Sequence, residues 1–104
     1  MKTMCMVHDI IFKSKIYETA RHLGAEVAFV DSYEQCGGAG KIIVDLEQFG
    51  IEGAHEFRQQ NPKTKMIGYL SHVNTDLKAQ ALRAGFDLVL ARSEFSAKVA
   101  QILV

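Results

Sequence analysis

The sequence predicts an α/β fold in which a five-stranded parallel sheet lies between layers of helices. Short apolar runs rich in β-branched residues alternate with amphipathic segments, and this alternation occurs five times along the chain. Parallel strands need long right-handed crossovers, which cover the sheet with helices. The chain has 104 residues, 48% of them hydrophobic, so we expect one core and a single domain over 1–104.

The first half of the chain contains three of the expected strands and one full helix. Apolar residues spaced for one helical face predict a helix from about Lys13 to Leu23, and Gly24 ends it. The first strand can also run on toward Phe12. The glycine-rich segment 32–40 has room for a turn or two of helix, so the second helix is expected to be reduced. The three strands are expected at 4–7, 25–30 and 42–45.

The second half supplies two strands and three helices. An apolar face between positions 51 and 57 marks a helix that ends before the Asn-Pro pair, because proline disfavours helical geometry in the residue before it. Asn74 or Thr75 is expected to cap the next helix and Ser93 the last one. The strands are expected at 65–70 and within 86–91. Sheets of this kind usually have the strand order 2-1-3-4-5.

Composition argues against several classes of function. Twelve basic residues balance twelve acidic ones without a long run of either sign, whereas nucleic-acid binding needs clustered cations. No apolar stretch approaches the roughly 20 residues that span a membrane, and the N-terminal residues are interpreted as a strand and not as a secretion signal. Cys5 and Cys36 lie far apart, which favours reduced thiols in a cytoplasmic protein.

Asp45 is the residue on which the functional interpretation depends. It ends an apolar strand, and a buried strand has no use for a carboxylate at its end unless that end opens into a site. In open α/β sheets, ligands bind outside the carboxyl ends of the strands. The expected strand order brings the ends of strands one, three and four together, with strand five alongside. These ends carry His8, Asp9, Asp45, Ser71, His72 and Arg92.

Carboxylates, a hydroxyl and a cation at one sheet edge are the groups needed to phosphorylate an aspartate. Mg²⁺ binds one or two carboxylates together with phosphate oxygens. A carboxylate nucleophile can form an acyl phosphate, whose oxygens a nearby hydroxyl and cation then contact. The sequence therefore places the parts of a phosphoacceptor site at this edge.

On these residues, and over nearly its whole length, the chain resembles a response-regulator receiver domain, the CheY-like module of flavodoxin-like topology. The resemblance implies that Asp45 is the phosphoacceptor and binds Mg²⁺ together with Asp9. It implies that Ser71 and Arg92 contact the phosphoryl group. It also implies a cytoplasmic two-component signalling protein that is no enzyme beyond accepting a phosphoryl group. A sensor histidine kinase or a downstream effector would be its partner, and a homodimer is one form of output.

The sequence also departs from the receiver pattern. Receivers carry two adjacent acids after strand one, and here the first of them is His8. Arg92 and Ser93 stand where receivers have Lys-Pro, and a planar guanidinium does not replace an ammonium conservatively. Val89 occupies the position of the aromatic switch residue. These departures favour a second hypothesis, a pseudo-receiver that kept the fold and binds proteins without phosphorylation.

Each candidate residue also has an ordinary structural interpretation. Asp9 and Asp45 can cap the helices that follow them. Ser71 can bond the turn after its strand, and Arg92 can be a surface cation near a helix start. In these interpretations the strand ends carry no chemistry.

The histidines and the glycines raise further alternatives. His8 and His72, near two carboxylates, suit Zn²⁺ and give a third hypothesis, a small metal- or ligand-binding protein. The glycine cluster at 36–41 does not predict a phosphate loop, because it leads into a strand instead of following one. No nucleophile elbow or Ser-His-Asp pattern is visible, so an independent hydrolase has the least support.

A receiver-like chain without an effector domain needs a readout surface that works in trans. In receivers this surface is commonly the side that runs from strand four to the last helix. The resemblance implies that this side includes Leu77, Ala81, Val89 and Phe95.

Overall fold

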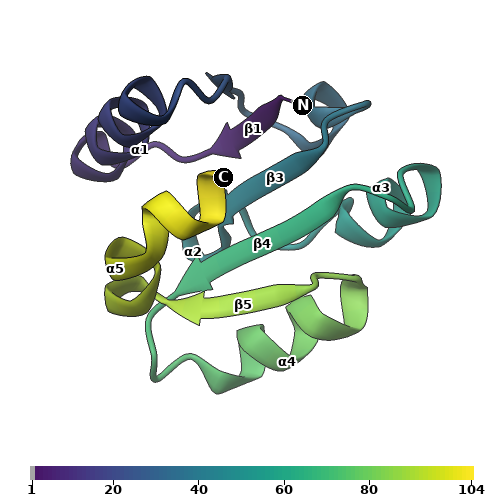
Figure 1. Cartoon of the computed structure of the whole chain (residues 1–104). Helices are drawn as coiled ribbons and strands as arrows, with labels where there is room; N and C mark the ends of the chain where they lie inside the picture. Colours follow the sequence, from purple (N-terminus) through teal and green to yellow (C-terminus); the bar gives the residue numbers. More distant parts are fainter. Residues whose placement is uncertain (1) are drawn as a thin grey trace.

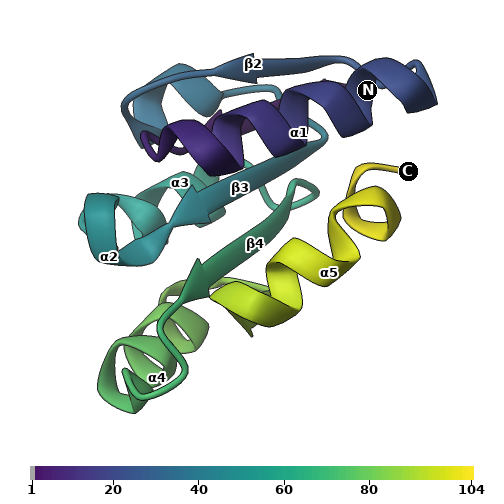
Figure 2. The same ribbon diagram turned by 90° about the vertical axis from the view of Figure 1, so that its left-hand side faces the viewer.

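The protein, in a computed structural model that describes residues 2–104, is built on one sheet of five parallel strands. The strands are β1 (Thr3–Met6), β2 (Val27–Phe29), β3 (Lys41–Asp45), β4 (Lys65–Leu70) and β5 (Leu88–Ala91). Their order across the sheet is β2-β1-β3-β4-β5. Figure 1 shows β1, β3, β4 and β5 side by side, and β2 is labelled in Figure 2. The fold class and the strand order predicted from the sequence are confirmed.

Helices cover both faces of the sheet. The helices are α1 (Ile10–Leu23), the 3₁₀ helix η1 (Tyr33–Cys36), α2 (Leu46–Phe49), α3 (Ala54–Gln60), α4 (Thr75–Ala84) and α5 (Arg92–Leu103). The pair α1 and α5 lies on one face, and α3 and α4 lie on the other (Figure 2). The second helix was expected to be reduced to a turn or two, and the four-residue η1 stands in its place. Within residues 2–104, no helix has the length and apolar character needed to cross a bilayer.

Two hydrophobic clusters fill the space between the sheet and its two helical layers. Side chains alternate along each strand, so neighbouring residues of β3 enter different clusters. Ile43 packs with Phe95 under α1 and α5, whereas Ile42 and Val44 pack with Phe57 on the other side. Both clusters contain fully buried residues. The sheet between them pairs β3 with β4 in parallel register, with Asp45 opposite Tyr69.

The first helix begins earlier than the sequence suggested. The predictions of a start near Lys13 and of a strand running toward Phe12 were wrong, because β1 stops at Met6 and α1 begins at Ile10. The carboxylate of Asp9 accepts hydrogen bonds from the backbone N–H groups of Ile11 and Phe12, which defines this helix start. The cap satisfies donors that the first helical turn leaves without a partner.

The last helix and the segment after β3 also differ from expectation. The prediction that Ser93 caps the last helix was wrong, because α5 begins at Arg92 and Ala91 precedes it without a side-chain cap. The short helix α2, which starts directly after Asp45, was not predicted. Gly50 ends α2 with φ at 70°, a conformation that glycine adopts without strain.

The four residues that were expected to belong to a readout surface do not form an exposed surface. Ala81, Val89 and Phe95 are buried, at 0%, 5% and 0% exposure. Leu77 is half-buried and packs against the cluster on its side of the sheet. The expectation fails because these positions are the inward faces of α4, β5 and α5, which any α/β sandwich of this kind must cover.

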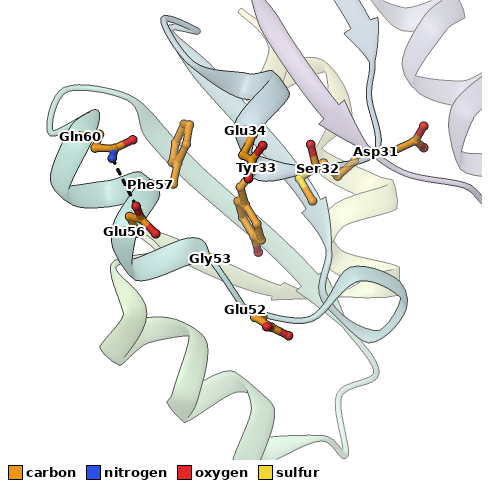
Figure 3. A pocket seen from close by; sticks show the side chains of 10 residues that line it. Asp31, Ser32, Tyr33, Glu34, Glu52, Gly53, Glu56, Phe57 and Gln60 are labelled. Carbon is orange, nitrogen blue, oxygen red and sulfur yellow. Dashed lines mark hydrogen bonds between the residues drawn. The ribbon is translucent and has the colours of Figure 1, made fainter.

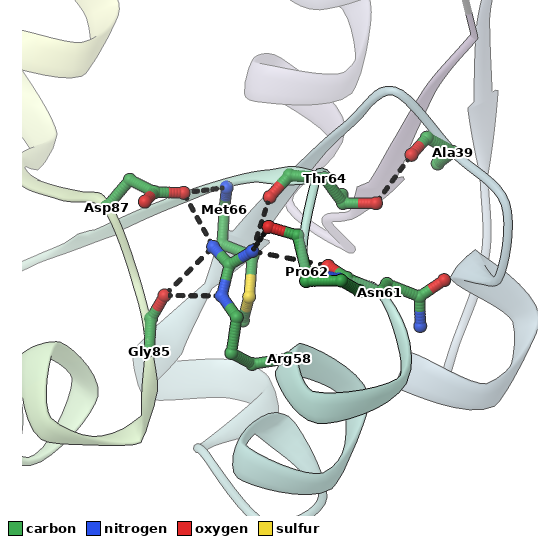
Figure 4. Close-up of polar contacts among 8 residues, drawn as sticks. All are labelled: Ala39, Arg58, Asn61, Pro62, Thr64, Met66, Gly85 and Asp87. Carbon is green, nitrogen blue, oxygen red and sulfur yellow. Dashed lines mark hydrogen bonds and ion pairs between the residues drawn. The ribbon is translucent and has the colours of Figure 1, made fainter.

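A cluster of polar contacts joins α3, β4 and β5 at the sheet edge opposite the ends of β1, β3 and β5 (Figure 4). The guanidinium of Arg58 donates to the carbonyl of Gly85 and pairs with Asp87 at 2.6 Å. Asp87 in turn accepts from the backbone N–H of Met66 at 2.8 Å. Arg58 donates further to the carbonyl groups of Asn61, Pro62 and Thr64.

Candidate functional site

Three charged side chains meet at the carboxyl edge of the sheet. Asp9 follows β1, Asp45 ends β3 and Arg92 follows β5. Because all the strands are parallel, these ends lie at one edge. The three side chains line a shallow cavity of about 400 Å³ together with His8, Glu47 and Gln48.

Asp9 has a structural and an electrostatic role. One carboxylate oxygen, Oδ1, accepts from the first turn of α1 at 2.8 and 3.1 Å. The other, Oδ2, accepts from Nη2 of Arg92 at 3.1 Å. Both oxygens of this carboxylate therefore have partners within the protein.

Asp45 is nearly buried, at 5% exposure. Its Oδ1 accepts from the backbone N–H of Gln48 at 3.3 Å and caps α2. Its Oδ2 lies 3.6 Å from Nη1 of Arg92. The capping interpretation and the site interpretation hold together for this residue, because each uses a different oxygen.

Arg92 connects the two carboxylates through different nitrogens of one guanidinium group. This planar group lies over the ring of Phe12, 4.9 Å from its centroid, and near the ring of Tyr69, 5.4 Å away. Cation–π contact and a bridging ion pair fix the plane of the group from two directions. The structure therefore places Arg92 in the site, with its charge shared between Asp9 and Asp45.

Tyr69 lies beneath this arrangement and was not predicted as a site residue. It is the register partner of Asp45 in the ladder between β3 and β4 and is fully buried. Burial raises the pKa of its hydroxyl far above the ordinary value, and the neighbouring Asp45 carboxylate raises it further. Within residues 2–104, its hydroxyl is the buried side-chain polar atom without a hydrogen-bond partner. The apolar sequence of β4 led to its interpretation as a core residue. The register of β3 with β4 places its side chain on the same face of the sheet as that of Asp45.

Ser71 and Asn74 contact Glu47 and do not line the cavity. The backbone N–H of Ser71 donates to one carboxylate oxygen of Glu47 at 3.0 Å, and the Asn74 side chain donates to the other at 3.1 Å. Glu47 thereby holds the loop after β4 against α2, a role that the sequence did not reveal. Asn74 precedes α4 as expected, but its side chain does not cap the helix.

The two candidate metal-binding histidines are not brought together, because only His8 lines the cavity. His8 pairs with Asp31 at 2.8 Å and meets the ring of Phe49 edge-on. His72 is exposed and lies outside the cavity. Throughout residues 2–104, no group of three or more His, Cys, Asp or Glu side chains has the geometry to hold a metal ion.

The residues present do not fit a resident Mg²⁺ ion either. Mg²⁺ requires free carboxylate oxygens in near-octahedral geometry. Asp9 has both oxygens engaged, and the Asp45 oxygen that faces the cavity is opposite the Arg92 cation. A divalent cation here would also lie beside the guanidinium charge, which repels it. Binding of Mg²⁺ by both carboxylates would therefore require Arg92 to release them, and the expectation that Asp9 and Asp45 bind this ion stays a prediction.

Comparison with known proteins identifies the fold. No protein-family model and no curated protein sequence matches the chain. A solved response regulator from Burkholderia pseudomallei, containing a phosphorylated aspartic acid, a calcium ion and citrate, superposes with a TM-score of 0.75 at 16% identity. That match covers 99% of this chain and 66% of the Burkholderia chain.

A second solved structure has the same architecture. It is a CheY-like response regulator from Mesorhizobium loti, with a TM-score of 0.76 at 16% identity over 97% of this chain and 93% of the other. The chain thus has the receiver fold of response regulators, as the sequence resemblance implied. At this identity, likeness of structure establishes the fold, and the function has to be argued from the site.

Proposed function

We propose that this chain is a receiver-fold signalling module that works through protein–protein contacts and keeps Asp45 in a permanently paired state. The observation that carries the proposal is the guanidinium of Arg92, which bridges Asp9 and Asp45. An internal cation neutralises the two carboxylates that a receiver would use for metal-assisted phosphorylation. The fold then serves as a fixed scaffold for partner binding.

Two further features support a pocket without phosphoryl chemistry. Ser71, the expected switch hydroxyl, is engaged through its backbone by Glu47 and stands outside the cavity lining. The buried Tyr69 occupies the space under Asp45 with a bulky ring stacked on Phe95 at 4.5 Å. The loop after β4 is thus held by Glu47 without a phosphoryl group.

A second candidate function is phosphorylation of Asp45, and a specific observation favours it. Asp9, Asp45 and Arg92 converge at one sheet edge, as they would in a phosphoacceptor pocket. In such a reaction a carboxylate oxygen of Asp45 would attack phosphorus and form an acyl phosphate. The bond from phosphorus to the donor would break, releasing the imidazole of a kinase phosphohistidine, or acetate when the donor is acetyl phosphate. A sensor histidine kinase would then be a partner, whereas the first candidate needs only a downstream effector.

Intact mass spectrometry distinguishes these two candidates. The protein and its Asp45→Asn variant are incubated with acetyl phosphate and Mg²⁺, and their masses are compared before and after acid treatment. We expect no phosphoryl adduct on either protein. A single labile adduct on the wild type that is absent from Asp45→Asn would overturn the proposal and establish Asp45 as a phosphoacceptor.

A further inference from the structure

A groove separate from the Asp45 site lies between η1 and the start of α3 (Figure 3). It has a volume of about 280 Å³. Its floor is apolar and consists of Met6, Tyr33 and Phe57, each less than a tenth exposed. The reduced helix η1 and the short helix α3 leave this part of the sheet layer open.

The rim of the groove carries negative charge. Exposed carboxylates stand on both sides, with Glu34 on η1 and Glu52 and Glu56 around the start of α3. Asp31 adds a fourth at the end next to His8. Among the described residues that line the groove there is no Lys, Arg or His, so these charges have no cation inside it. The groove is therefore an acidic opening over an aromatic floor.

The aromatic floor is held rigidly. The rings of Tyr33 and Phe57 lie 6.2 Å apart with their planes inclined by 44°. The hydroxyl of Tyr33 donates to the carbonyl of Gly50 at 2.7 Å, which fixes the ring. Gly53 lies against the same ring, and an added Cβ would be in ordinary van der Waals contact with it at 3.6 Å. An occupant therefore meets a preformed surface and pays little to order it.

We propose that this groove binds an arginine-bearing segment of a partner protein. The methylene stem of the arginine lies on the apolar floor, where it covers Phe57 and Tyr33. The guanidinium reaches the carboxylates of Glu52 and Glu56 at the rim, where paired hydrogen bonds to carboxylate oxygens are favourable. The size of the groove suits one or two side chains, so the neighbouring residues of the segment lie across its edge.

Charge complementarity selects this occupant over others. A neutral apolar segment would leave the carboxylates of Glu34, Glu52 and Glu56 at its border without a counter-charge, and an acidic segment would be repelled. A free polyamine shares the positive charge but has no planar group that could donate two parallel hydrogen bonds to one carboxylate. A second copy of this chain is less suitable, because its formal net charge is zero.

The experiment is a titration of the ¹⁵N-labelled 104-residue chain with a capped Arg-Leu-Arg tripeptide, with spermidine titrated in parallel. We expect amide shifts confined to the surroundings of Tyr33, Gly53 and Phe57. The double variant Glu52→Gln/Glu56→Gln should bind the tripeptide about tenfold more weakly, since each exposed ion pair contributes modestly. Glu26→Gln/Asp76→Asn removes the same charge elsewhere and should bind like the wild type.

Several outcomes would overturn the proposal. Shifts spread over the acidic surface, or equal weakening in both double variants, would mean non-specific attraction. Spermidine binding as tightly and at the same amides would assign the groove to free polyamines. No shift at millimolar tripeptide would mean that the groove takes no such segment. The proposal is independent of Asp45, because the groove residues exclude Asp9, Asp45 and Arg92, and a phosphoryl adduct at Asp45 would leave this test unchanged.

Discussion

Arg92 decides what the carboxyl edge of the sheet can do. A lysine at this position would place a compact charge on one carboxylate, whereas the guanidinium contacts Asp9 and Asp45 together and stacks on Phe12. Arg92 and Asp9 are partly exposed, but Asp45 is nearly buried, so removing Arg92 leaves the Asp45 charge without compensation. The properties of the site therefore depend on this one side chain.

We expect Arg92→Ala to lower the free energy of unfolding by about 1–3 kcal/mol, because it leaves two adjacent carboxylates facing each other. The same variant should gain thermal stability in Mg²⁺, since the cavity then offers free carboxylate oxygens to a cation. The wild type should show no such gain. Differential scanning fluorimetry in the presence and absence of millimolar Mg²⁺ measures the change in melting temperature. Arg92→Lys is the control, because it retains a positive charge. Mg²⁺ stabilisation of the wild type would contradict the account of the site.

The hydroxyl of Tyr69 gives a second test at the scale of one residue. This hydroxyl is buried without a hydrogen-bond partner, so removing it breaks no hydrogen bond and leaves no other group unpaired. Tyr69→Phe should therefore be neutral or stabilise the protein by up to about 1 kcal/mol. Tyr33→Phe is the matched control, because it loses the hydrogen bond to the carbonyl of Gly50 and should destabilise by about 1 kcal/mol. Urea denaturation of both variants measures the difference, and a clear loss in Tyr69→Phe would reveal a missing partner.

Sequence reasoning recovered part of the candidate site. Asp9, Asp45 and Arg92 could be predicted because strand order alone brings the ends of β1, β3 and β5 to one edge. Tyr69 and Glu47 could not, since the role of each comes from a tertiary neighbour. Tyr69 lies in an apolar strand that gives no sign of a polar role, and Glu47 lies in the short helix α2, which was not predicted.

At the scale of elements, helices and strands with a periodic apolar pattern could be predicted from the sequence, whereas helix starts set by a capping side chain could not. The bounds of β4 agree with the apolar run 65–70, and α3 ends before the Asn-Pro pair as expected. The start of α1 was missed because a carboxylate cap extends the helix beyond its apolar pattern. The short helix α2 was missed because it has a single turn and owes its start to the buried Asp45.

Arg58 joins three elements, and its loss should be felt as a loss of stability. Five carbonyl or carboxylate partners surround its guanidinium, drawn from Asn61, Pro62, Thr64, Gly85 and Asp87. An ammonium group cannot satisfy partners on so many sides, so Arg58→Lys should lower the free energy of unfolding by about 2–3 kcal/mol. Chemical denaturation measures this.

Arg21→Lys is the control for Arg58→Lys. Arg21 is exposed and pairs with Glu18 within one helix, an interaction that solvent screens. We expect no measurable change in its unfolding midpoint. Equal effects of the two substitutions would mean that the contacts of Arg58 add nothing beyond a surface pair.

At the scale of the whole molecule, the two cysteines lie in different halves of the core. Cys5 is fully buried under α1 and α5, and Cys36 is fully buried on the opposite side of the sheet. Burial raises the pKa of Cys5 from 9.0 to about 12 and that of Cys36 from 9.0 to about 11. A thiolate is the reactive form, so both thiols are structural and are expected to be inert at neutral pH.

These raised pKa values make stability fall in alkaline solution. In the unfolded chain both thiols ionise near their ordinary value of 9.0, whereas in the folded chain they keep their protons to higher pH. Above pH 9 the unfolded state therefore releases protons first and is stabilised by doing so. The stabilising contribution is complete below pH 9 and declines as pH rises toward the folded values, by about 1 kcal/mol per thiol between pH 9 and 10.

Urea denaturation at pH 7.5, 9 and 10 measures this decline, and the Cys5→Ala/Cys36→Ala variant is the comparison. The variant should start from a lower stability but lose less of it between pH 9 and 10 than the wild type does. The window stops at pH 10 because burial raises the pKa of Tyr33 and Tyr69 and lowers that of Lys41, and these groups act with opposite signs at higher pH. An equal alkaline loss in the variant would show that other groups govern it. A smaller loss in the variant would show that the two buried thiols supply the difference.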